Sequence, residues 1–146
     1  MSLLRELFRP FPKKLATVPA GRLLVFGALA KGDRAFSPED LAGLDAAFQT
    51  PDVGRYKAGF HGRAVRMAGL LQACAPKSGP LYLNAGSRDG SKVIAYWLSE
   101  LEPLAWVVYG DGAFQLVVPG ADAPRASIPD LALIEIANQG ETERGV

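Results

Sequence analysis

The chain has 146 residues, enough to bury a core without metal ions or disulfides as cross-links, and this length predicts one globular domain. Its apolar content of 49% is ordinary, and no apolar run approaches the roughly 20 residues that a membrane-spanning helix needs. With one cysteine, no secretory signal pattern after Met1 and a net charge of only +1, the sequence favours a soluble cytoplasmic protein and disfavours nucleic-acid binding.

Residues 1–14 predict an N-terminal arm that starts as a short helix. Leu3, Leu4, Leu7 and Phe8 are apolar, and two prolines and two lysines follow them. Such a helix is too short to be stable alone in water, so we expect it to dock on the body of the protein. Peripheral membrane contact through residues 2–14 is the less favoured interpretation, because an interfacial helix needs a longer and more basic face.

Two elements are expected in the next part of the chain. Residues 22–30 form an apolar run without alternation, which suits a buried strand or a buried helix, and we favour the strand. Ser37 is a typical N-cap residue, Pro38 suits the first helical position, and the acids that follow suit the positive end of a helix dipole. A helix is therefore predicted from Pro38, and its buried side is formed by Leu41, Leu44, Ala47 and Phe48.

The segment from about residue 56 to residue 74 predicts a long basic helix. Its apolar side chains recur every three or four residues and stop before Pro76; they are Tyr56, Phe60, Ala64, Met67, Leu71 and Cys74. Arg55, Arg63 and Arg66 would project near one edge of this stripe. Cys74 is expected to be buried as a small apolar side chain, and His61 to lie at the surface.

Residues 81–101 predict a strand, a turn and a second helix. Leu81–Leu83 can form a short strand, and residues 84–92 are small, polar and rich in turn-forming types. From Asp89 onward, apolar side chains at helical spacing predict a helix that Pro103 ends; these side chains are Val93, Ile94, Trp97, Leu98 and Leu101.

The strongest local signal is a β-hairpin over residues 104–118. Asp111-Gly112 suits a two-residue turn and separates two apolar, β-prone runs. With that turn, Val107 faces Leu116, and the opposite side of the ribbon carries Trp106, Val108 and Val117. Because neither side alternates to polar residues, we expect helices to cover one side and helices or another subunit to cover the other.

Together these elements predict an α+β fold in a single domain, 1–146. In this fold a small sheet containing the hairpin (about 104–118) packs against three to four helices. Residues 1–14 form the N-terminal arm, residues 140–146 form a flexible tail, and no element is predicted between Pro119 and that tail.

The sequence contains no recognisable catalytic or metal-binding constellation. His61 and Cys74 are the only residues of their kinds, and on one helix they would lie too far apart to act as base and nucleophile. Structural zinc requires four His or Cys ligands, which the chain does not have. We therefore predict no metal and no cofactor, and an enzyme is the less favoured class.

The turn at residues 84–92 is a candidate ligand site. A turn between a strand and a helix start can aim backbone N–H groups at an anion. The candidate ligand-binding residues are Asn84, Gly86, Ser87, Arg88, Ser91 and Lys92. Their spacing matches neither a P-loop nor the dinucleotide fingerprint, and a plain turn in which Asp89 or Ser87 caps the helix is the favoured alternative.

Charge is segregated along the chain in a way that suits a protein partner. Residues 53–92 carry seven basic side chains and one acidic one, whereas residues 93–146 carry two basic and eight acidic ones. Such blocks usually belong to solvated surfaces, but they also suit electrostatic recognition of a partner or of a second copy. The candidate interface residues are Arg55, Arg63, Arg66, Trp106, Val108 and Val117.

Two classes of function follow from this pattern. The favoured one is a small intracellular protein that acts by binding another protein or itself, as an adaptor, inhibitor, immunity protein or chaperone. The alternative is a small transferase or regulatory domain that binds an anion, a nucleotide or an acyl carrier at residues 84–92.

Overall fold

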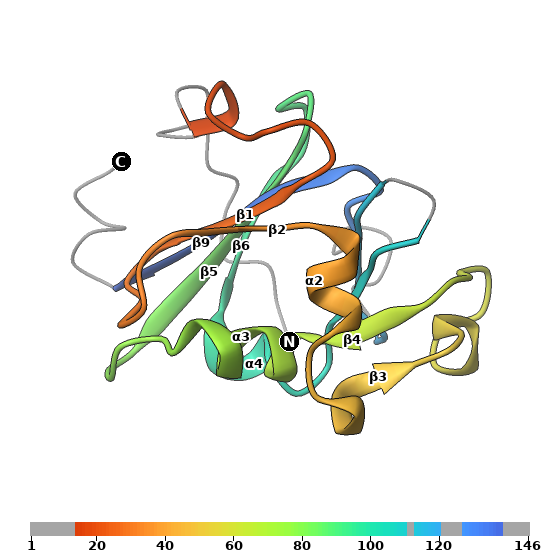
Figure 1. Ribbon diagram of the computed structural model, residues 1–146. Coiled ribbons are helices and arrows are strands. Elements are labelled where there is room, and N and C mark those ends of the chain that lie inside the picture. Colours follow the sequence, from red (N-terminus) through yellow and green to blue (C-terminus); the bar gives the residue numbers. More distant parts are fainter. Residues whose placement is uncertain (1–13, 111–112, 121–126, 139–146) are drawn as a thin grey trace.

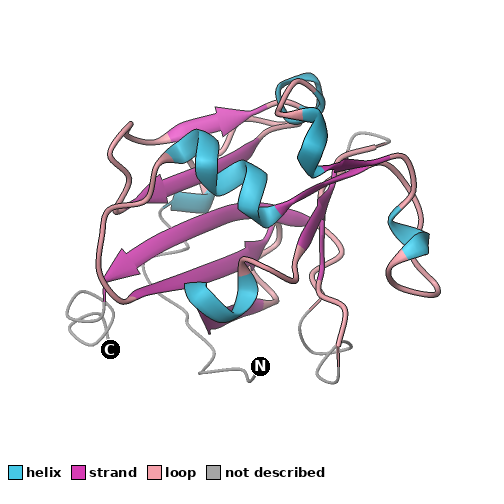
Figure 2. Cartoon of the chain, turned by 90° about the horizontal axis from the view of Figure 1, so that it is seen from below, coloured by secondary structure: helices cyan, strands magenta, loops and turns pink. Residues whose placement is uncertain are grey.

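Two β-sheets that share one core make up most of the structure (Figure 1). This computed structural model describes residues 14–110, 113–120 and 127–138. Within these ranges the helices are short, and Figure 2 shows how much more of the chain is strand. The helices are α2 (Pro38–Ala42), α3 (Met67–Cys74) and α4 (Leu98–Leu101), and two 3-10 turns cover Ala46–Phe48 and Val53–Arg55.

The larger sheet has five strands in the order β2-β1-β9-β5-β6. They are β1 (Leu23–Gly27), β2 (Arg34–Phe36), β5 (Leu81–Ser87), β6 (Val93–Trp97) and β9 (Leu131–Asn138). The central strand β9 runs parallel to β1, with Val25 opposite Ile134, and antiparallel to β5, with Leu83 opposite Ile136. The outer pairs, β1 with β2 and β5 with β6, are antiparallel.

The smaller sheet has four antiparallel strands in the order β3-β4-β7-β8. They are β3 (Gln49–Thr50), β4 (Ala64–Arg66), β7 (Trp106–Val108) and β8 (Gln115–Val117). Arg66 lies opposite Trp106, and Trp106 in turn lies opposite Val117. This register places Arg66 and Trp106 side by side on one face of the sheet.

The main core lies between the two sheets. It includes Leu83 and Ile134 from the larger sheet and Val107 and Leu116 from the smaller one, all four fully buried. Helix α3 adds Leu70 to the same core. Burying an aliphatic side chain of this size stabilises a fold by about 1.5–3 kcal/mol, so this contact between the sheets dominates the stability of the protein.

Each sheet also buries apolar side chains on its other face. On the larger sheet, Phe26 and Leu133 pack in a separate cluster, and on the smaller sheet Trp106 and Val117 do the same. Covered on both faces, the strands need no alternation between apolar and polar residues. This explains why β9 reads as a nearly continuous apolar run.

The predicted fold class is wrong. The sequence indicated an α+β fold in which a small sheet packs on three to four helices, whereas the chain is mostly β, with sheets of five and four strands. The hairpin 104–118 does lie in the smaller sheet, but its main packing partner across the core is the other sheet rather than a layer of helices.

The predicted basic helix 56–74 is also wrong, because only Met67–Cys74 is helical. Gly59 and Gly62 have φ angles of +89° and +109°, in the left-handed region that a right-handed helix excludes. Ala64–Arg66 form β4 and pair with β7. The helical spacing of apolar residues thus arises from a loop, a strand and a short helix that each bury their own side chains.

The predicted helix 89–101 divides into two elements. Val93–Trp97 form β6, which is rich in the β-branched and aromatic residues that fit a sheet, and only Leu98–Leu101 form a helix. The turn before β6 closes a hairpin with β5, in which Ser87 N donates to Lys92 O at 2.9 Å.

Other predictions are confirmed. Residues 23–27 form a strand, and Ser37 caps α2 in a capping box: its Oγ accepts from Asp40 N at 3.0 Å, and its own N–H donates to Asp40 Oδ2 at 2.9 Å. The predicted length of this helix is wrong, because α2 ends at Ala42 and Ala46–Phe48 form a separate 3-10 turn. Val107 lies opposite Leu116, as the hairpin register requires, and both sides of the ribbon are covered. The predicted N-terminal helix, the Asp111-Gly112 turn and the tail 140–146 lie outside the described residues.

Gly27 sets the distance between β1 and β9. It lies opposite Ile136 with a φ angle of +109°, and a Cβ at this position would collide with the carbonyl oxygen of Ile136. The same oxygen accepts a hydrogen bond from Ala28 N at 2.7 Å. Glycine is therefore needed here both for its backbone angle and for the close approach of the two strands.

We expect Gly27→Ala to lower the free energy of unfolding by more than about 3 kcal/mol, because the strands must shift apart as well as bear the unfavourable backbone angle. Gly32→Ala is the matched control: its φ angle is +79°, but no atom lies near the added Cβ. The free energy of unfolding of that variant should fall by only about 1–2 kcal/mol. Urea unfolding measures both, and equal losses would contradict the close approach of β1 to β9.

Candidate binding surface

The predicted ligand turn is the connection of a β-hairpin and not the start of a helix. Asn84 and Gly86 belong to β5, and the chain reverses between Ser87 and Lys92 before it enters β6. Asn84 is only 1% exposed, and its Nδ2 donates to Glu135 Oε1 of β9 at 3.0 Å. The helix N-terminus that would have bound an anion is therefore absent from this turn.

Asp89 takes up the hydrogen-bond donors of the turn. Its Oδ1 accepts from Ser91 Oγ at 2.7 Å, from Ser87 Oγ at 2.8 Å and from Ser91 N at 2.9 Å. These bonds, those from Ser91 first, hold the pKa of Asp89 at about 2, below its ordinary value of 3.8. A negative charge that already occupies these donors disfavours a bound anion.

The two cations of the predicted ligand turn point to backbone oxygens elsewhere. The guanidinium of Arg88 donates to the Arg22 carbonyl at 3.0 Å, and Lys92 Nζ donates to the carbonyl of Ser127. Burial lowers the pKa of Lys92. The six predicted residues are thus divided between the interior of the sheet and its hairpin turn.

We expect the Asp89 carboxyl group to titrate near pH 2 in the folded protein, with the Ser91 amide resonance moving at the same midpoint in an NMR titration. Because folding depresses this pKa, its stabilising effect is present above pH ~4 and disappears as the pH falls through ~2. Ser91→Ala should raise the midpoint. A midpoint at the ordinary value in the unaltered protein would contradict this turn geometry.

The predicted interface residues of the hairpin are covered by the same chain. Trp106, Val108 and Val117 are buried and pack with Val53 and Phe60. A partner protein therefore cannot contact these three side chains directly. It would contact the loop that covers them.

Asp52 fixes both ends of this covering loop, residues 53–62. Its Oδ1 accepts from Gly54 N at 3.0 Å and from Gly62 N at 3.2 Å, and Val53 N donates to the Gly62 carbonyl at 2.9 Å. The hydrogen bonds from Gly54 and Gly62 lower the pKa of Asp52. The loop is thereby closed over the outer face of the smaller sheet.

The three predicted arginines do not lie together. Arg66 lies on the outer face of the smaller sheet, where its guanidinium carbon is 4.6 Å from the Trp106 ring centroid. Arg63 instead stacks on Tyr109, which belongs to the main core on the opposite face. Arg55 is exposed in the covering loop. A single helical edge, as the sequence suggested, would have grouped all three.

A stack of two aromatic rings and one guanidinium forms the centre of the candidate surface. The rings of Tyr56 and Trp106 lie 4.7 Å apart, and the Arg66 guanidinium carbon lies 5.8 Å from the Tyr56 centroid. Arg66 also donates to the Pro103 carbonyl at 3.4 Å, beside Leu104. Tyr56 is 47% exposed and Leu104 is 40% exposed. Among the described residues, these two are the large apolar residues that are exposed. We call Tyr56, Arg66 and Leu104 the stacked surface.

Sequence reasoning found Arg66 and Trp106 but missed Tyr56 and Leu104 as surface residues. Tyr56 fitted the apolar stripe of a helix that does not form, and Leu104 was assigned to the first position of a strand that in fact begins at Trp106. Pro103, directly before Leu104, and two glycines after Tyr56 were the available signals that these residues lie in turns.

The single cysteine and the single histidine of the chain lie in different surroundings. Cys74 is buried, as predicted, and burial raises the pKa of its thiol to about 11, so it is protonated at neutral pH. His61 is exposed. No group of three or more His, Cys, Asp or Glu side chains that could hold a metal ion occurs among the described residues.

Comparison with known proteins adds no assignment. No protein-family model and no curated protein matches the sequence.

Among the helices of the described ranges, none has the length and apolar character required to cross a membrane.

Proposed function

We propose that the protein acts by binding a partner protein through the stacked surface, and that it has no catalytic role. The observation that supports this most is the exposure of two large apolar side chains near the contacts of Arg66. Tyr56 lies 5.8 Å from the Arg66 guanidinium carbon, and Leu104 directly follows Pro103, whose carbonyl accepts a hydrogen bond from Arg66. Exposed apolar side chains scattered singly need no explanation, but in our proposal these two side chains and Arg66 form one patch, which association would cover.

The residue types of this surface suit a binding site. Tyrosine, tryptophan and arginine are the residues that most often dominate the energy of protein interfaces, because each buries a large area and offers a polar group. Stacking of Tyr56 and Arg66 on the buried Trp106 also restricts both side chains before association. A restricted side chain loses less conformational entropy when a partner covers it.

The charge around this surface favours an acidic partner. The covering loop adds Arg55 and Lys57 to the positive charge of Arg66, and these three cations outnumber the carboxylate of Asp52, which directly precedes the loop. A basic rim around an apolar centre raises the association rate of an acidic protein and makes that rate depend on salt. An adaptor, inhibitor, immunity protein or chaperone would each use such a surface.

Leu104→Glu is the sharpest test, because the exposed leucine adds little to the fold and the new charge repels an acidic partner. Immobilised wild-type protein should retain an acidic partner from an extract of the cells that make it, with affinity falling as salt rises. The variant should retain that partner at least about tenfold less tightly while its melting temperature stays within a few degrees.

Gln72→Glu is the matched control, since it introduces the same charge at an exposed position of α3 outside the stacked surface. It should retain the partner like the wild type. Light scattering on the purified protein identifies self-association, in which case Leu104→Glu should produce a monomer. Equal retention by both variants, or a monomeric wild type that retains no partner, would contradict the proposal.

A further inference from the structure

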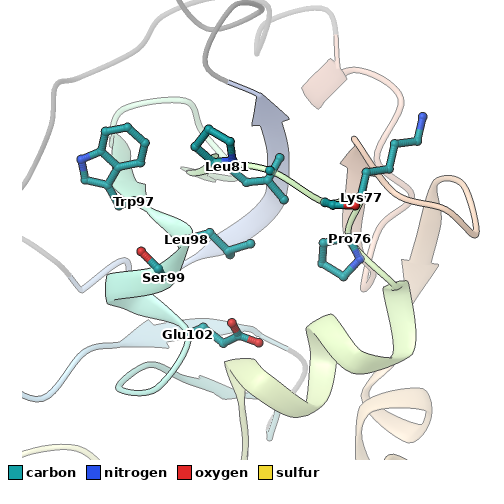
Figure 3. A pocket seen from close by; sticks show the side chains of 10 residues that line it. Pro76, Lys77, Leu81, Trp97, Leu98, Ser99 and Glu102 are labelled. Carbon is teal, nitrogen blue, oxygen red and sulfur yellow. The ribbon is translucent and has the colours of Figure 1, made fainter.

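A pocket separate from the stacked surface lies between α4 and the segment that follows α3 (Figure 3). Its volume is about 340 Å³, within the range of sites that hold small ligands or single side chains. Apolar groups form most of its walls, from Pro76, Pro80, Leu81 and Leu98. Glu102, at the end of α4, supplies a carboxylate.

The wall of this pocket is held in place by backbone hydrogen bonds to the end of β1. Ala30 N donates to the Ala75 carbonyl at 2.7 Å, and Lys77 N donates to the Ala28 carbonyl at 3.0 Å. Ala75 has a φ angle of +55°, in the left-handed region. Among the described residues, it is the non-glycine residue with a positive φ angle. The chain thus accepts an unfavourable backbone angle to turn from α3 into this wall.

The opposite wall is fixed by aromatic stacking. Trp97 lines the pocket, and its ring lies 4.4 Å from that of Tyr82, across the β5–β6 pair. The stacking keeps the indole at the rim of the pocket. A wall that is already ordered loses little entropy when a ligand enters.

The charge of the pocket comes from Glu102. Its carboxylate is turned toward the space between α4 and α3, whereas the ammonium of Lys77 extends away from the pocket (Figure 3). Glu102 has no ion pair within the described ranges. A carboxylate at one end of an apolar pocket favours a ligand that carries one positive charge on an apolar stem.

We propose that this pocket binds an organic ammonium group on an apolar stem, with the stem against Leu81 and Leu98 and the ammonium at Glu102. The same chemistry is offered by a free alkylamine and by a lysine side chain of a peptide. Both sources therefore enter the test as separate probes. The proposal rests on different residues from the stacked surface, so each can fail alone.

The test uses the two tryptophans of the chain, Trp97 at the pocket and Trp106 on the other sheet. n-Butylammonium should shift the indole N–H resonance of Trp97 in an NMR titration and leave that of Trp106 unmoved. n-Butanol, which has the same stem without the charge, should bind at least about tenfold more weakly. A blocked Gly-Lys-Gly peptide, compared with Gly-Gln-Gly, tests the peptide source in the same way.

Glu102→Gln should reduce n-butylammonium binding at least about tenfold, whereas Glu39→Gln, an exposed acid on α2, should leave it unchanged. The amine and alcohol comparison needs no variant, so it decides the question even if Glu102→Gln does not fold. Absence of a Trp97 shift with both cationic probes, equal binding of amine and alcohol, or unchanged binding to a folded Glu102→Gln would each overturn the proposal.

Discussion

The position of β9 between β1 and β5 is the constraint on which the rest of the structure depends. This strand pairs antiparallel with β5 from Leu131 to Asn138 and parallel with β1 from Leu133 to Ile136. Ile134 and Ile136 face the main core, and Leu133 faces the cluster around Phe26 on the opposite side of the sheet. Without β9, the β1–β2 and β5–β6 pairs would be two separate hairpins, which are marginal in water.

The stacked surface also depends on β9, because the smaller sheet that carries it packs against the core that β9 helps to build. Val107 and Leu116 bury one face of that sheet against the core that β9 helps to build, which leaves its other face for Trp106. The loop closed by Asp52 then covers Trp106 and positions Tyr56 beside Arg66. The pocket at Glu102 depends on the larger sheet in the same way, because Leu81 belongs to β5 and Trp97 to β6.

Local signals in the sequence predicted local structure well. The Ser37 cap is a contact between residues three positions apart, and the pairing of Val107 with Leu116 in the 104–118 hairpin joins two runs that are close in the sequence. Helical spacing over residues 56–74 was misleading because Gly59 and Gly62 break the helix, and an apolar period cannot reveal that. Over Val93–Trp97 the β-branched and aromatic residue types were the better guide than the spacing.

The sequence could not predict the central strand or the binding surface, since both arise from pairing between distant residues. Leu131–Ala137 is a short apolar run that suits several structures, and its assignment as β9 comes from β1 and β5, far away in the chain. Likewise, Arg66 meets Trp106 through the pairing of β4 with β7, and Tyr56 reaches them through a loop. Arg66 and Trp106 were therefore identified as individual residues, but their stacking was not.

Native-state hydrogen exchange tests the central role of β9 most directly. If β9 joins the β1–β2 and β5–β6 pairs into one sheet, the amides of Leu133, Ile134 and Ile136 should exchange only through global unfolding, with an opening free energy equal to that from urea unfolding. Amides of the edge strand β2 should open at lower free energy. Exchange of the β9 amides as readily as those of β2 would contradict the account.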